Sequence, residues 1–120
     1  MILVTAYVRP HKLEEVKSSL VLLPISGMTV SDARGCGNHP EKPTSFFGMD
    51  MLVSLPIVSK VQIAVDDDLA EDIIEAIRSA AETGQEGDGK IFIEPLLDAV
   101  RIRTLTWPRS FVTFYRLRRL

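Results

Sequence analysis

The sequence has few of the features that mark secreted, disulfide-linked or membrane-spanning proteins. Cys36 is the single cysteine in 120 residues, so an internal disulfide is excluded. No apolar run approaches the roughly 20 residues that a membrane-crossing helix needs. The first residues lack the positively charged start of a secretion signal. We therefore expect a cytoplasmic protein.

Net charge is also small, at −2. A slightly acidic chain is not expected to bind nucleic acid over its whole surface, because such binding depends on an excess of Lys and Arg. The composition is 46% hydrophobic and 25% charged, and the length is that of one ordinary domain. These values predict a single globular domain with a substantial core.

Acidic side chains gather in one part of the chain, and they are Asp66, Asp67, Asp68, Glu71, Asp72 and Glu75. They precede apolar residues at helical spacing. Aspartate caps helix N-termini, and acids in the first turn complement the helix dipole. We interpret the cluster as the start of a helix, with a metal site as the alternative.

Hydrophobic periodicity predicts the secondary structure. The expected strands are Ile2–Val8, Met28–Arg34, Met51–Leu55, Val58–Val65, Lys90–Glu94 and Arg101–Thr104, and the expected helices are Lys12–Leu23 and Leu69–Ala81. Met51–Leu55 and Val58–Val65 fit either two strands or one long strand interrupted near Pro56. The stretch Asn38–Asp50 has no periodicity and predicts a long loop.

This element order, βαββαβ with an extra terminal strand, is the ferredoxin-like arrangement of the α+β class. In that fold, two helices cover one face of an antiparallel sheet. The other sheet face then needs a cover, which three copies packed sheet to sheet would supply. We expect a homotrimer.

The segment Gly87-Asp88-Gly89-Lys90 follows the second predicted helix. Glycines permit a sharp turn, and they also let backbone N–H groups approach an anion while a lysine adds charge. By itself, this segment fits a structural turn or a phosphate-binding turn.

Its context resembles the PII signal-transduction family. Thr83-x-x-x-Gly87-Asp88-Gly89-Lys90-Ile91-Phe92-Ile93 matches one family motif, and Arg101-Ile102-Arg103-Thr104 matches the family's "RIRT" stretch. The resemblance runs in order over residues 1–104, which would form one domain with a mobile loop at about residues 37–50. The remaining residues 105–120 form a divergent basic and aromatic tail.

Family members are trimeric regulators that bind ATP or ADP between subunits and act on partners through the loop. The resemblance implies an adenine nucleotide ligand (ATP, ADP or AMP) and no enzymatic activity. It places the nucleotide against Gly27, Met28, Thr29, Gly35, Cys36, Gly37, Asn38, His39, Gly87, Asp88, Gly89, Lys90, Arg101 and Arg103. The adenine would lie near the first three and the phosphates near the remaining glycines, Lys90 and the arginines. The protein target is unknown, with membrane transporters and metabolic enzymes as the candidate classes.

The loop departs from the family pattern. Met51 replaces the tyrosine that many bacterial members modify, and Met49 replaces a phosphorylated serine. Asn38 and His39 replace an arginine and a glutamine, and Val58 replaces a lysine. These positions serve metal and 2-oxoglutarate binding in the family, so the resemblance implies an atypical PII-like nucleotide sensor.

The sequence is also compatible with a different class of function, metal sensing. Cys36 and His39, with Met49 and Met51 in the same loop, include the soft ligands that suit Cu(I). The alternative is therefore a trimeric copper-type metal-sensing or tolerance protein of CutA-like architecture. The basic tail either packs on the protein's own surface or contacts a membrane protein or lipid headgroups.

Overall fold

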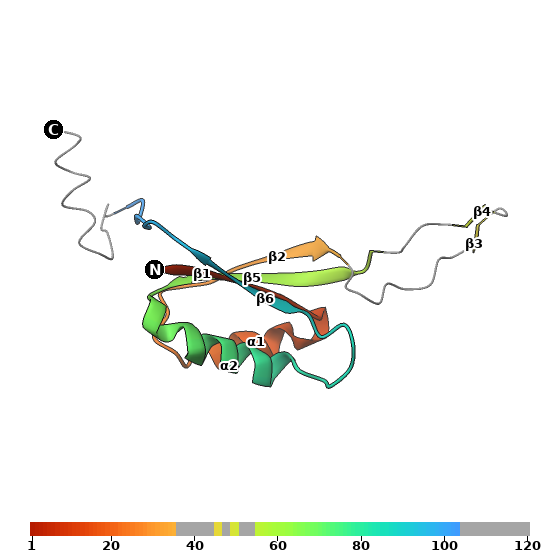
Figure 1. The fold of residues 1–120 in the computed structure, drawn as a ribbon, viewed down its shortest axis with the longest axis horizontal. Helices are drawn as coiled ribbons and strands as arrows, with labels where there is room; N and C mark the ends of the chain where they lie inside the picture. The colour runs from red at the N-terminus through yellow and green to blue at the C-terminus, as the bar shows by residue number, and fades with distance from the viewer. Residues whose placement is uncertain (36–44, 47–48, 51–54, 104–120) are drawn as a thin grey trace.

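The computed structural model describes residues 1–35, 45–46, 49–50 and 55–103 (Figure 1). Its strands are β1 (Ile2–Val8), β2 (Thr29–Arg34), β3 (Ser45–Phe46), β4 (Met49–Asp50), β5 (Ile57–Val65) and β6 (Lys90–Pro95). Its α-helices are α1 (Leu13–Leu20) and α2 (Ala70–Ala81), preceded by the short 3-10 helices η1 (Pro10–Lys12) and η2 (Asp67–Leu69).

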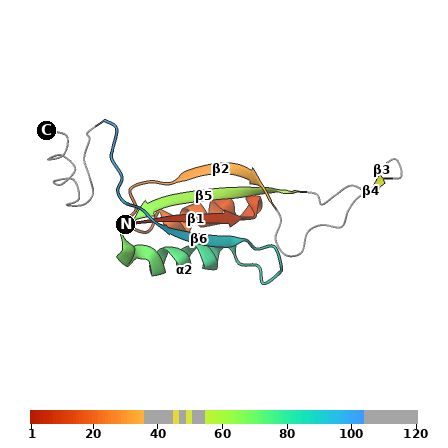
Figure 2. The same cartoon turned by 45° about the horizontal axis from the view of Figure 1, so that its top comes forward.

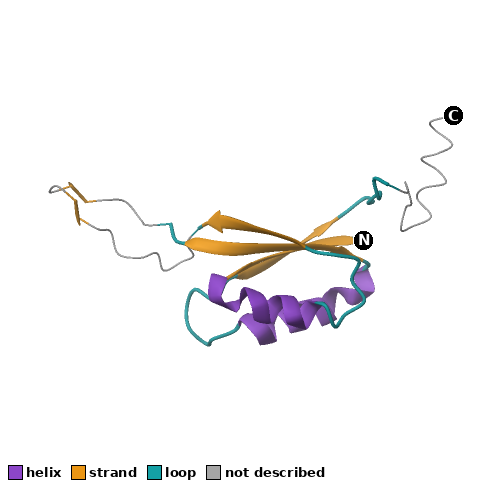
Figure 3. Ribbon diagram, turned by 180° about the vertical axis from the view of Figure 1, so that it is seen from behind, coloured by secondary structure: helices purple, strands orange, loops and turns teal. Residues whose placement is uncertain are grey.

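Four strands form one antiparallel sheet in the order β2-β5-β1-β6 (Figure 2). Both α-helices lie on the same face of this sheet, which leaves the opposite face open (Figure 3). Strand β1 is central and is paired on both sides, whereas β2 and β6 are the edges. The α+β, ferredoxin-like prediction is therefore confirmed.

The core lies between the sheet and the helices. Its buried members are Val4, Ala6 and Val8 of β1, Val61, Ile63 and Val65 of β5, Val16 and Leu20 of α1, and Ile73, Ile77, Ala80 and Ala81 of α2. Burial alternates along most of β5, as expected when successive side chains point to opposite faces of a sheet. Leu3, Tyr7 and Lys60 therefore face away from the helices.

Helix α1 ends earlier than its periodicity predicts. The helix stops at Leu20, and Val21 is its C-cap. Pro24 disfavours the helical conformation at the residue before it, so the helix cannot continue to Leu23. Leu23 nevertheless packs on the core, because the Leu23 N–H donates to the Leu20 carbonyl in a tight turn.

The predicted last strand is wrong over its described part. Arg101 is not in a strand, and Ile102 and Arg103 form a turn; Thr104 lies outside the described residues. Strand β6 ends at Pro95, which has no N–H to donate, and β1 already has a partner on each side. The segment after β6 instead runs out past the N-terminal end of β1 (Figure 1).

The predicted long loop contains a short hairpin. Strand β3 pairs antiparallel with β4, joining Ser45 to Asp50 and Phe46 to Met49. The strand expected at Met51–Leu55 is not found at Leu55, and residues 51–54 lie outside the described residues.

Candidate functional site

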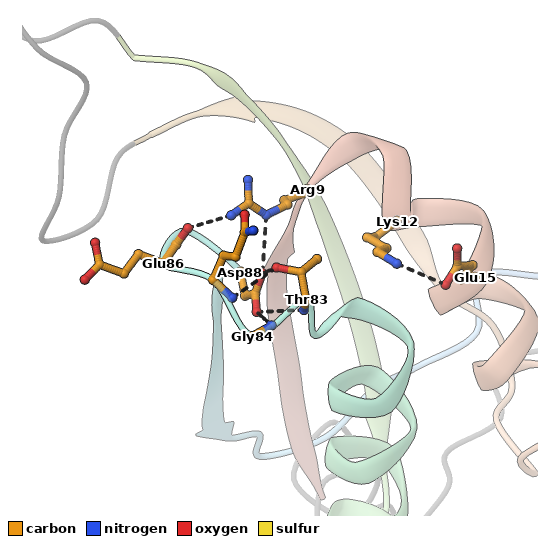
Figure 4. A network of polar contacts seen from close by, with 8 residues as sticks. Arg9, Lys12, Glu15, Thr83, Gly84, Glu86 and Asp88 are labelled. Carbon is orange, nitrogen blue, oxygen red and sulfur yellow. Dashed lines mark hydrogen bonds and ion pairs between the residues drawn. The ribbon is translucent and has the colours of Figure 1, made fainter.

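The turn between α2 and β6 is built around the carboxylate of Asp88 (Figure 4). The backbone N–H groups of Thr83 and Gly84 donate to Asp88 Oδ2 over 2.8 and 3.0 Å, and the Thr83 hydroxyl donates to Oδ1. The hydrogen bonds from Thr83, with further donation from Gly84 and Arg9, lower the pKa of Asp88 to about 2. Asp88 is thus ionised at neutral pH and points into the turn.

Arg9 holds the same turn from the end of β1. Its Nε lies 3.3 Å from Asp88 Oδ1, and its Nη2 donates to the carbonyl of Glu86. Gly87 leaves the space for this guanidinium, since a Cβ there would lie 3.0 Å from Arg9 Nη2. The turn that carries the predicted phosphate ligands is therefore tied to the central strand by one side chain.

Gly89 can hold no side chain. Its φ is +112°, in the region that L-residues avoid, and a Cβ would lie 1.7 Å from the carbonyl oxygen of Tyr7. The next residue, Lys90, begins β6 and pairs with Tyr7. The glycine thus allows the turn to join the sheet in close contact with β1.

Gly89→Ala should destabilise the fold by about 2 to 5 kcal/mol, as the sum of backbone strain and overpacking. Gly84→Ala is the matched control, because Gly84 has φ +82° but nothing lies within 4 Å of its added Cβ. The control should lose only about 1 to 2 kcal/mol. Thermal unfolding of both variants measures the difference; equal losses would show that the contact with Tyr7 does not constrain the turn.

A hollow of about 360 Å³ adjoins this turn. Its lining includes apolar Val8, Ile77 and Ala81 together with Gly89 and Lys90. The acids Glu82 and Asp88 and the cation Arg78 also line it, so the hollow combines an apolar wall with side chains of both charges and with glycine backbone. Gly35 lies at the same end of the sheet, where its N–H donates to the carbonyl of Pro56 just before β5.

A second hollow, of about 370 Å³, lies at the other end of the sheet. Met1, Ser26, Ala64 and Arg101 are among its lining residues. The chain that leads into β2 and the segment that follows β6 therefore meet at this end. Gly27 and Met28 follow directly on Ser26, and Thr29 begins β2.

The predicted ligands thus fall into two groups in one chain. Lys90 pairs with Tyr7, whereas Arg101 lines the same hollow as Met1, which is six residues and roughly 20 Å from Tyr7 along the strand. Thr29 is on the opposite edge strand from Lys90, three strand spacings or roughly 14 Å across the sheet. A single subunit therefore does not bring the two groups together.

Four predicted ligands, Cys36, Gly37, Asn38 and His39, lie outside the described residues. The copper alternative rests on Cys36 and His39 and on side chains in the same loop, so it stays untested. Within the described ranges, no three His, Cys, Asp or Glu side chains gather as metal ligands. Of the acidic cluster, Asp67 and Asp68 lie in the first turn of η2 and Glu71 and Asp72 in the first turn of α2. Asp66 is the N-cap residue of η2 but makes no side-chain capping hydrogen bond.

Sequence reasoning missed Arg9. Arg9 is not among the residues that the sequence singled out, because a contact across 79 positions leaves no local pattern. The available signal was chemical: an aspartate inside a turn expected to hold phosphate needs a cation to balance its charge.

Comparison with known proteins decides the family. The model of the family described as "Nitrogen regulatory protein P-II" matches residues 1–106. The chain belongs to the P-II family. It is 46% identical to nitrogen regulatory protein P-II 1 of Methanothermobacter thermautotrophicus, over 84% of this chain and 88% of the relative. It is 45% identical to the P-II protein of Nostoc punctiforme and 41% identical to that of Azospirillum brasilense, each over 84% of this chain and 90% of the relative.

Membership of the P-II family confirms the predicted resemblance and the predicted class of function. Its members are regulatory signal-transduction proteins rather than enzymes, so the prediction of a non-enzymatic regulator is confirmed. In the part of the chain that the structure describes, no helix is both long and apolar enough to cross a bilayer.

Proposed function

We propose that this P-II protein is a homotrimeric, cytoplasmic sensor of adenine nucleotides. Each nucleotide binds between two subunits. One subunit supplies Gly35 and the turn from Gly87 to Lys90, and its neighbour supplies Gly27–Thr29 and Arg101 with Arg103. The occupied site regulates a partner protein through the segment between β2 and β5.

The separation of the two ligand groups carries this proposal. Residues that the family resemblance assigns to one nucleotide lie at opposite ends of the described fold, as given by the pairing of Lys90 with Tyr7 and the position of Arg101 beside Met1. A ring of copies packed head to tail would bring the far end of one subunit to the near end of the next. A site between subunits reconciles the family pattern with the fold.

The open sheet face supports the trimer. Helices cover the other face, so Leu3, Tyr7 and Val58 point outward by strand alternation. Phe92 on β6 is 50% exposed and meets Tyr7 edge to face, with ring centroids 6.0 Å apart. An open face with several apolar and aromatic side chains is typical of a surface covered by another subunit. Light scattering should therefore give about three times the chain mass of 13.4 kDa.

The charges suit a polyphosphate. Lys90, Arg101 and Arg103 are exposed cations. Asp88 would oppose an anion, but its carboxylate is ionised against Arg9 and accepts the N–H groups of Thr83 and Gly84. The turn can therefore present Lys90 and glycine backbone to phosphates while the Asp88 carboxylate is engaged by donors of its own chain.

Lys90→Ala and Arg103→Ala should each weaken ATP binding about tenfold to a hundredfold, since a charge-assisted hydrogen bond contributes roughly 1.5–3 kcal/mol. The loss should be smaller for AMP, which carries fewer phosphate charges. Calorimetric titration with both nucleotides measures this difference, and circular dichroism confirms the fold. Equal losses for ATP and AMP in a folded variant would mean that the phosphates bind elsewhere.

A further inference from the structure

Arg9 is the one described side chain that links β1 to the turn before β6 through both an acid and a backbone carbonyl. Its Nε reaches Asp88 and its Nη2 reaches the Glu86 carbonyl. The side chains of Arg9 and Asp88 are 30% and 24% exposed, so the pair is partly shielded from water. These contacts fix the turn on both sides of Gly87.

The contacts have an electrostatic consequence. An ionised Asp88 without a counter-charge would place a negative charge inside the turn that is expected to receive phosphate. The repulsion would grow with the number of phosphate charges on the ligand. The guanidinium of Arg9 offsets that charge from the side of β1 and at the same time fixes the carboxylate that holds the N–H groups of Thr83 and Gly84.

We propose that Arg9 is a positioning residue of the nucleotide site, acting through Asp88 and the Glu86 carbonyl. It shapes the turn from Thr83 to Lys90 and offsets the negative charge of Asp88. This inference rests on the nucleotide binding proposed above. It assigns to Arg9 a role in the preference for ATP over AMP.

Arg9→Gln removes the charge and most of the fork of donors. It should weaken ATP binding about tenfold but AMP binding only about twofold, because the uncompensated carboxylate repels the more charged ligand more strongly. Arg9→Lys keeps the charge without the fork, so it should recover part of the ATP affinity. Lys17→Gln is the matched control: it removes a cation that pairs with Glu14 on α1, far from the turn in the sequence, and should leave both affinities unchanged.

The variant Asp88→Asn tests whether Arg9 acts on nucleotide binding through the Asp88 carboxylate. If Arg9 acts through this carboxylate, Arg9→Gln should cost about threefold or less in ATP affinity when Asp88→Asn is already present. The same tenfold loss in both backgrounds would overturn the proposal, because Arg9 would then act independently of Asp88. No loss in either background would overturn it as well.

Amide hydrogen exchange separates this inference from nucleotide binding itself. Without nucleotide, Arg9→Gln should speed exchange at the Thr83 and Gly84 amides about tenfold, since both donate to the carboxylate that Arg9 holds. Faster exchange in a protein that binds no nucleotide would support the positioning of the turn and reject the proposed function. Tight ATP binding in wild type, with unchanged exchange and affinity in Arg9→Gln, would reject the inference alone.

Discussion

Mixed trimers of Lys90→Ala and Arg101→Ala subunits should regain one intact nucleotide site each, although neither variant alone binds ATP well. In a head-to-tail ring, Lys90 of one subunit meets Arg101 of the next. Any trimer that contains both variants then has a single interface at which both side chains are native. Two different affinity tags, co-expression and tandem purification isolate these trimers.

Calorimetry reads the outcome directly. The mixed trimers should bind ATP with wild-type affinity at about one third of the wild-type stoichiometry, against a tenfold to hundredfold loss in each pure variant. Trimers of two differently tagged wild-type chains control for the tags. If the mixed trimers bind no better than the pure variants, then Lys90 and Arg101 of one subunit serve the same site, and the intersubunit arrangement is rejected.

The sequence predicted the fold well where local pattern and tertiary packing agree. The alternation from Val61 to Val65 and the helical stripe from Ile73 to Ala80 both became core. Predictions failed where spacing was the only signal. Leu23 keeps helical spacing but follows the end of α1. Arg101–Arg103 was predicted to be a strand, but β1 already pairs with a strand on each side and has no edge left for it. Pairing partners are a property of the whole sheet and not of the segment.

The sharp turn before β6 was predictable from its glycines, but its contacts were not. Gly87 and Gly89 signalled a special turn, and both have positive φ values of 93° and 112°. No pattern in the sequence indicated that Arg9 would hold Asp88, because that contact joins segments 79 positions apart. Nor could a linear motif show that Lys90 and Arg101 lie at opposite ends of β1.

Binding of 2-oxoglutarate should be undetectable below ~1 mM, even with saturating ATP and magnesium. In the family pattern described above, a glutamine helps hold the metal and a lysine pairs with the acid's carboxylate. Here those positions are His39 and Val58. Val58 pairs with Ala33 on the open face of β5. Because its side chain is aliphatic, this position supplies no charge. Lys60 shares the face but lies two residues, roughly 7 Å, further along the strand, where it pairs with Tyr7 and Ser31.

Losing a partner for a charged ligand in a partly buried site costs several kcal/mol, which moves about micromolar affinity toward about millimolar. The double variant His39→Gln with Val58→Lys should therefore gain binding of at least about tenfold, while His39→Gln with Val58→Leu should not. Titration of 2-oxoglutarate into each protein with ATP and magnesium measures this gain. Low-micromolar binding by the wild type would show that this chain senses the acid through other side chains, such as Lys60.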